Sequence, residues 1–383
     1  MGDEIMERLK LFDRIAQGKA SRRDITKALG LAGLAAVTSP LLPRAARAGD
    51  ELTYFTWNGY NIPEFHPGYI EKHGSSPNMV VFGEDEEALT KARAGFRADL
   101  AHPCKVTLGR WRDAGLIEPF DMSRIPAWAD LWDELKNADG VTTDASNKHG
   151  AGTWYIPWEW GNASVVYRTD IATEYNGKPS WEILFDEKYK GRLAQFDSVD
   201  GAVLVAGLVA HAKDPFNMTD EEFKKARELL TKQRDLLRFW WTDQTTVEQG
   251  ITSGELVAAY CWNDAVVRLK KAGVPVEYMK PKEGIFTWFC GLVKCKNGPG
   301  DVNAAYDLVN AMLEPRVGKY LIENFGYGHS NKKSFEQVDT ATLDGLGIRQ
   351  PQDLFKSGIF FAEMDNDIRQ KYIAMFEQVK AGG

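Results

Sequence analysis

Histidine and cysteine are the residues of this chain that could bind a metal ion or act as nucleophiles, and their spacing favours neither role. The six histidines include no H-E-x-x-H pair and no other spacing typical of a metal site. The four cysteines form no C-x-x-C pair, and the sequence leaves open which two would join in an oxidising compartment. No G-x-S-x-G elbow and no G-x-x-x-x-G-K-[ST] phosphate loop is present. We therefore expect a protein that is no enzyme and uses no metal or cofactor. The alternative is an exported enzyme whose catalytic residues come from distant segments.

The first 48 residues have the order of an export signal. Ser21-Arg22-Arg23-Asp24-Ile25-Thr26-Lys27 precedes a mildly apolar run, and Ala46-Arg47-Ala48 closes the segment as an A-x-A cleavage site. This pattern is similar to a twin-arginine signal and predicts a periplasmic protein that begins near Gly49. The apolar run is too short and too rich in small residues for a transmembrane helix. The alternative is an amphipathic N-terminal helix with an accidental arginine pair.

The charge of the remaining chain argues against a nucleic-acid partner. The whole sequence carries 47 Lys and Arg against 54 Asp and Glu, and residues 1–48 hold nine of the former and five of the latter. The part from residue 49 onward therefore has a net charge of −11. Such an acidic protein is a poor ligand for a polyanion.

The elements expected along the mature chain alternate between short apolar runs and amphipathic helices, which is the pattern of an α/β protein with mainly parallel sheets. Strands are expected at 51–57, 79–82, 98–103 and 256–262. Helices are expected at 84–93, at 219–233 and at 301–313, and residues 219–222 form a capping box at the start of the second. A chain of this length exceeds one ordinary core and predicts two lobes.

Seven short motifs occur in one order and spacing along the mature chain. They span residues 54–60, 156–161, 179–185, 189–193, 260–263, 281–288 and 325–327. With these motifs the chain resembles the periplasmic solute-binding proteins of ABC importers, in the spermidine/putrescine-binding branch. The resemblance runs from about Leu52 to the C-terminus.

The resemblance implies a two-lobed α/β fold of the type II periplasmic-binding-protein kind, with hinge crossings near 156–161 and 287–291. We expect residues 49–157 and 290–330 in one lobe and residues 158–289 and 331–383 in the other. Closure of the lobes on a small ligand would create the surface that the membrane permease recognises. The protein is expected to be a monomer.

Aromatic residues occupy the positions that line the interlobe cleft in this family. Trp57, Tyr60, Trp262, Trp288 and Tyr327 are the expected ligand contacts. Trp158 and Trp160 flank the first hinge crossing, where they either contact the ligand or pack the hinge. Ring faces attract a cation that has no N–H donors, such as a quaternary ammonium or a sulfonium.

Several carboxylates of polyamine binders are replaced in this chain. Gly59, Cys290, Ser198 and Gly201 stand where the resemblance would place acidic residues or other acceptors, and Cys290 is expected to be a small buried residue. The chain is therefore expected to bind a methylated onium osmolyte in an aromatic cage, with dimethylsulfoniopropionate and glycine betaine as the leading candidates.

Two further features bear on the charge of this ligand. Lys105 lies in a loop that contacts the ligand in the family, where it would neutralise the carboxylate of a zwitterion. Asp197 also lies close to a cleft loop. The alternative is a polyamine, held by acidic residues that remain. These are Asp197, Asp200, Glu159 and Asp264.

Overall fold

The computed structural model describes residues 51–382 of the 383-residue chain. The predicted export signal and its cleavage site lie outside the described residues. Within the described part of the chain, no helix is long and apolar enough to span a membrane.

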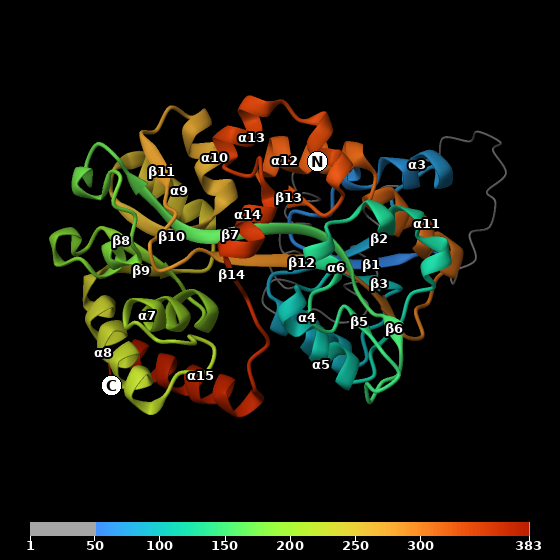
Figure 1. The fold of residues 1–383 in the computed structure, drawn as a ribbon, viewed down its shortest axis with the longest axis horizontal. Helices are drawn as coiled ribbons and strands as arrows, with labels where there is room; N and C mark the ends of the chain where they lie inside the picture. Colours follow the sequence, from blue (N-terminus) through green and yellow to red (C-terminus); the bar gives the residue numbers. More distant parts are fainter. Residues whose placement is uncertain (1–50, 383) are drawn as a thin grey trace, which may run out of the picture. The chain divides into compact units, whose positions relative to one another are not determined.

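Strands and helices alternate along the described chain (Figure 1). The strands are β1 (Thr53–Trp57), β2 (Asn78–Phe82), β3 (Leu100–Ala101), β4 (Ile117–Glu118), β5 (Thr142–Thr143), β6 (Gly152–Thr153), β7 (Ile156–Arg168), β8 (Leu193–Phe196), β9 (Leu237–Trp241), β10 (Ala258–Trp262), β11 (Val276–Tyr278), β12 (Phe286–Cys295), β13 (Gly328–His329) and β14 (Ile359–Phe360). The helices are α3 (Pro67–His73), α4 (Asp85–Arg93), α5 (Leu108–Asp113), α6 (Asp133–Lys136), α7 (Leu204–Val209), α8 (Asp220–Leu236), α9 (Gln244–Ser253), α10 (Asn263–Lys271), α11 (Val302–Met312), α12 (Pro315–Phe325), α13 (Thr340–Leu346), α14 (Pro351–Ser357) and α15 (Asn366–Lys380).

The first lobe is built on β1, which pairs in parallel with β2 on one side and β3 on the other. The apolar and β-branched residues of β1 are buried except at its end, where Trp57 is half-buried. The strand therefore stops where the chain leaves the core and turns towards Tyr60.

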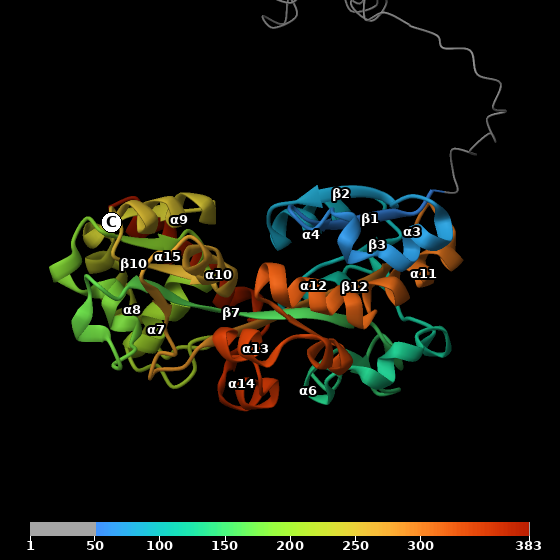
Figure 2. The ribbon, with the colours of Figure 1, turned by 90° about the horizontal axis from the view of Figure 1, so that it is seen from above.

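Two long strands, β7 and β12, run side by side from one lobe to the other (Figures 1 and 2). They pair antiparallel from Phe286 opposite Ala163 to Leu292 opposite Ile156. The register shifts between Cys290 and Gly291. Gly291 is required at this bulge because a Cβ there would lie 2.3 Å from the Ile156 carbonyl oxygen.

In the second lobe, β7 pairs antiparallel with β10, and β10, β8 and β9 continue the sheet in parallel. Helix α8 begins at the capping box expected from the sequence, with reciprocal bonds between Thr219 and Glu222. The sheets are mixed, because the two strands that link the lobes run antiparallel to all of their neighbours except β14, which pairs in parallel with β12. The expectation of mainly parallel sheets was wrong at this point.

Separate hydrophobic cores lie on the two sides of the linking strands. One core belongs to the second lobe and includes side chains of β8, β10, α8 and α15, such as Tyr372 and Phe376. The first-lobe core includes Phe55 and Trp111, and also Val338, Leu343 and Phe355. The last three of these side chains thus join the core around Phe55, and the expected lobe boundaries, with residues 331–383 in the second lobe, stay a prediction.

Candidate functional site

Four polar residues from separate elements converge near the lobe-linking strands. Tyr60 lies in the turn after β1, Glu159 on β7, Asp264 in the first turn of α10, and Tyr327 between α12 and β13. Each tyrosine interacts with both carboxylates, and both tyrosine pKa values are raised well above the ordinary value by burial and by this negative charge. The site therefore combines two phenol hydroxyls with two carboxyl groups.

Glu159 is the most deeply buried acid of this group, with an exposed fraction of 1%. Burial raises the pKa of its carboxyl group well above the ordinary value, a hydrogen bond from Tyr60 opposes the shift, and Asp264 adds to it. Its Oε2 atom has no hydrogen-bond partner among the described residues. Burial therefore disfavours the charged form of this carboxyl group unless a cation lies beside it.

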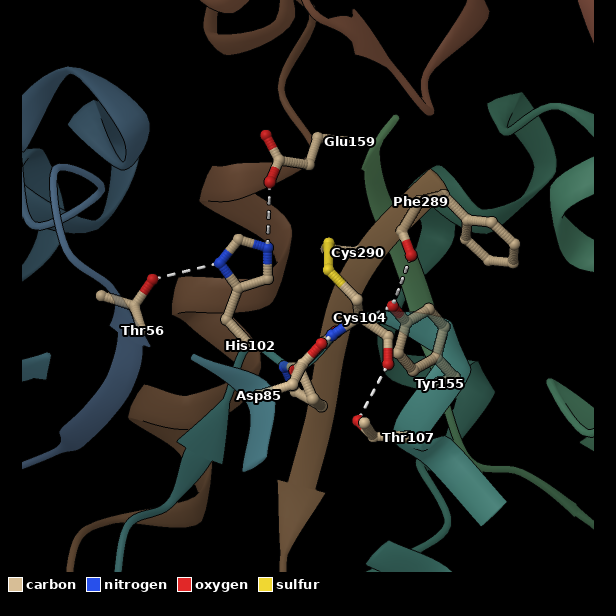
Figure 3. Close-up of a disulfide and its surroundings, with 10 residues drawn as sticks. Thr56, Asp85, His102, Cys104, Thr107, Tyr155, Glu159, Phe289 and Cys290 are labelled. Atoms are coloured by element: carbon tan, nitrogen blue, oxygen red, sulfur yellow. Dashed lines mark hydrogen bonds and ion pairs between the residues drawn. A yellow bond between two sulfur atoms is a disulfide. The ribbon is translucent and has the colours of Figure 1, made fainter. Parts of the chain in front are cut away.

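The nearest basic group to Glu159 is a histidine that carries no charge. Nε2 of His102 lies 3.5 Å from Oε1 of Glu159, and Nδ1 of the same ring lies 3.1 Å from Oγ1 of Thr56 (Figure 3). Burial lowers the pKa of His102 to about 3. The imidazole is therefore neutral at physiological pH and supplies no counter-charge.

Asp264 differs from Glu159 because it has a charged partner. Its Oδ2 lies 2.7 Å from a nitrogen of Arg268, one helical turn later in α10, and its Oδ1 accepts a 2.9 Å hydrogen bond from Gln244. Arg268 also pairs with Glu248 of α9. Asp264 is thus held at the edge of the site by Arg268 and Gln244.

Aromatic rings form a connected wall beside these polar groups. The Trp288 and Tyr327 rings are 4.9 Å apart in an edge-to-face arrangement, and Phe325 links Tyr327 to Tyr60 with ring separations of 6.3 and 5.8 Å. Trp262 and Trp288 both pack against core residues of the two lobes. The structure thus brings Tyr60, Trp288 and Tyr327 together at the interlobe border and places Trp262 on the same border. Phe325 was missed, because nothing in the sequence separates it from a core residue.

Trp57 and the two hinge tryptophans, Trp158 and Trp160, pack against neighbouring side chains and backbone of the protein. Trp57 is half-buried against Phe82, with ring centres 4.8 Å apart. Trp158 and Trp160 are fully buried. The indole N–H of Trp158 donates to the Met312 carbonyl oxygen, and the Trp160 ring packs on Phe355. The Trp158 ring also packs edge-to-face on Tyr60 of the site, with ring centres 5.8 Å apart, so ligand contact by the two hinge tryptophans stays a prediction.

Lys105 and Asp197 have charged neighbours outside the Tyr60–Glu159 group. Burial lowers the pKa of the half-buried Lys105, and the charges that oppose this shift are those of Asp139 and Glu363. Asp197 forms a 2.7 Å ion pair with Lys380 of α15. Each of these charges thus has a partner or neighbour outside the site, and their assignment as ligand contacts stays a prediction.

A disulfide joins Cys104 of the first lobe to Cys290 on β12 (Figure 3). Cys290 lies directly opposite Glu159 in the β12–β7 pairing, so the disulfide borders the site. The expectation that Cys290 is a small buried residue holds only for its burial, because its sulfur is paired. The described residues contain no group of His, Cys, Asp and Glu side chains suited to a metal ion.

Two α/β lobes linked by paired crossing strands, with buried polar and aromatic groups at their border, are the architecture of a solute-binding protein. The chain belongs to the bacterial extracellular solute-binding protein family, whose model matches residues 80–344. This membership confirms a binding protein and not an enzyme.

Individual relatives agree with the resemblance to the spermidine/putrescine branch of ABC-importer binding proteins. The chain is 25% identical to the putrescine-binding periplasmic protein PotF of Escherichia coli, over 86% of this chain and 91% of that protein. It is 24% identical to the E. coli spermidine/putrescine-binding periplasmic protein, over 91% and 97%. The crystal structure of the spermidine/putrescine ABC transporter substrate-binding protein PotD from Streptococcus pneumoniae has the same fold, with a TM-score of 0.71 and 21% identity over 87% of this chain and 99% of that one.

Proposed function

We propose that this protein captures a small organic cation with N–H donors, of the polyamine type, and delivers it to the membrane permease of an ABC importer. The observation that carries this proposal is Glu159, a buried carboxyl group with one oxygen that has no partner among the described residues. A buried carboxylate is stable only beside a positive charge or hydrogen-bond donors, and an ammonium group supplies both.

The surroundings of Glu159 support an ammonium ligand. The Tyr60 hydroxyl interacts with the same carboxyl group, and Asp264 adds a second negative charge within the site. The Trp288 and Tyr327 rings supply apolar and π surface for the methylene chain and the charge. The polyamine-binding relatives support the same reading, which revises our first expectation of an onium osmolyte.

The cellular location and the oligomeric state of the protein are also part of the proposal. The export signal expected at residues 1–48 and the extracellular family support a periplasmic location. A monomer with one ligand per chain fits a site made by the two lobes of a single chain.

A methylated onium compound is the second candidate ligand. It is favoured by the edge-to-face pair of Trp288 and Tyr327 and by Trp262, whose rings lie at the same interlobe border. Such a cation would leave the free oxygen of Glu159 without a hydrogen bond, which is why we place it second.

Calorimetric titration of the refolded mature protein would test both candidates. The ligands to compare are putrescine, spermidine, choline, glycine betaine and dimethylsulfoniopropionate. We expect tight one-to-one binding of an amine and no detectable binding of the onium compounds. Tight binding of an onium compound alone would exclude the polyamine reading and support the aromatic cage.

A further inference from the structure

An arginine of the C-terminal helix reaches from the second lobe to the first. Arg369 lies on α15, whose apolar face packs in the second-lobe core. One of its terminal nitrogens is 3.3 Å from Oε1 of Glu86 on α4, in the first lobe. The other is 3.5 Å from Oδ1 of Asp200 in the second lobe. The arginine side chain is only 16% exposed, so this bridge is partly shielded from solvent.

Glu86 is fixed by its own lobe before it meets Arg369. Arg110 of α5 donates two hydrogen bonds to its carboxylate, of 2.8 and 2.9 Å, in the paired geometry that favours arginine. The Glu86 carboxylate is therefore presented at a defined position. Arg369 has one well-placed partner on each side of the interlobe border.

Without Arg369, this border would hold carboxylates of both lobes facing one another. Burial raises the pKa of the Glu84 side chain to about 7, and the largest charge effect on it comes from Asp200 across the border. Asp85 and Glu86 follow Glu84 in the first turn of α4. Opposed carboxylates repel, so closing the lobes would cost free energy unless a cation lies between them.

We propose that Arg369 is a positioning residue for ligand capture, which stabilises the closed arrangement of the two lobes by bridging Glu86 and Asp200. The Glu86 contact exists only when the lobes are together, whereas the Asp200 contact lies within one lobe. A ligand that binds the closed form gains apparent affinity from every interaction that favours that form. This role does not depend on which cation the site accepts.

The test compares the variants R369Q and R369E with the wild type by small-angle X-ray scattering and by putrescine titration. R234Q is the matched control, because Arg234 bonds to the Val379 carbonyl oxygen of α15 from α8, inside the second lobe. We expect R369E to have a larger radius of gyration and a putrescine Kd raised about fivefold or more. R234Q should change neither quantity.

A double-mutant cycle with E86Q separates the bridge from a general effect of charge. If the bridge acts as described, E86Q/R369Q should lose no more affinity than R369Q alone. Additive losses, or wild-type scattering and affinity in R369E, would overturn the proposal. If putrescine fails to bind the wild type, the ligand proposal fails, and the ligand-free scattering curves of R369E and the wild type still decide the role of Arg369.

Discussion

Replacing Glu159 by glutamine is the sharpest probe of the ligand site. The change keeps the size of the side chain and an acceptor oxygen but removes the ability to carry charge. Burial already holds the pKa of Glu159 well above its ordinary value, so the charged form that glutamine cannot adopt is disfavoured in the ligand-free protein. We therefore expect E159Q to fold normally, with a thermal midpoint at pH 7 no lower than that of the wild type.

The expected loss is in binding. Removing one partner of a buried charged pair costs about 2–5 kcal/mol, and the retained amide oxygen puts E159Q near the lower end, at about 2–3 kcal/mol. At 1.4 kcal/mol per factor of ten, this corresponds to a Kd for putrescine roughly 30- to 150-fold higher. E118Q is a suitable control, because Glu118 is 40% exposed and pairs with Lys294 on the first lobe.

Proton release gives an independent measurement of the same event. If an ammonium group ionises Glu159, binding should release about one proton per ligand near pH 7. His102 cannot absorb this proton, because burial lowers its pKa to about 3. Titrations in two buffers of different ionisation enthalpy would count the proton. Tight amine binding with no proton release and an unchanged Kd in E159Q would refute this account of the site.

Three other predictions follow from particular contacts. The double variant C104S/C290S should unfold more easily, by up to about 5 kcal/mol in the chain-entropy limit, because the disulfide closes a loop of 186 residues; urea titration with and without reductant measures this. Burial raises the pKa of Asp85 to about 8, so the folded protein keeps a proton that the unfolded chain releases above pH 4. The free energy of unfolding should therefore fall as pH rises from about 4 to about 8, by at most about 1.4 kcal/mol per pH unit. In the D85N variant, the urea concentration at the unfolding midpoint should depend less on pH. W288A should weaken ligand binding about tenfold, whereas W288F should keep part of it, as measured by calorimetry; equal affinity in W288A would remove this ring from the site.

Short sequence patterns were enough to predict individual strands and helices, but not which other parts of the chain these elements pack against. The strand at β1 and the helix α8 were predicted because an apolar run and a capping box are complete within a few residues. Trp158 and Trp160 were left open because a strand pattern does not say which lobe each side chain enters.

The same limit applies to the candidate site: its motif residues could be predicted, but contacts between residues far apart in the sequence could not. Tyr60, Trp288 and Tyr327 could be named from their motifs, and the structure brings them together. The charge neighbours of Lys105 could not be foreseen, because Glu363 lies far along the chain. The partner of Cys290 stayed open because the two cysteines are separated by 186 residues and become neighbours only through the pairing of β12.

The position of α15 has a consequence for the timing of biosynthesis. Helix α15 supplies Tyr372, Met375, Phe376 and Val379 to the second-lobe core, whose other buried side chains come from residues 163–286 and from Met364. A ribosome-bound chain therefore cannot complete that core until α15 has been made and has left the ribosome. A chain that lacks α15 would leave that core incomplete however long it is given to fold.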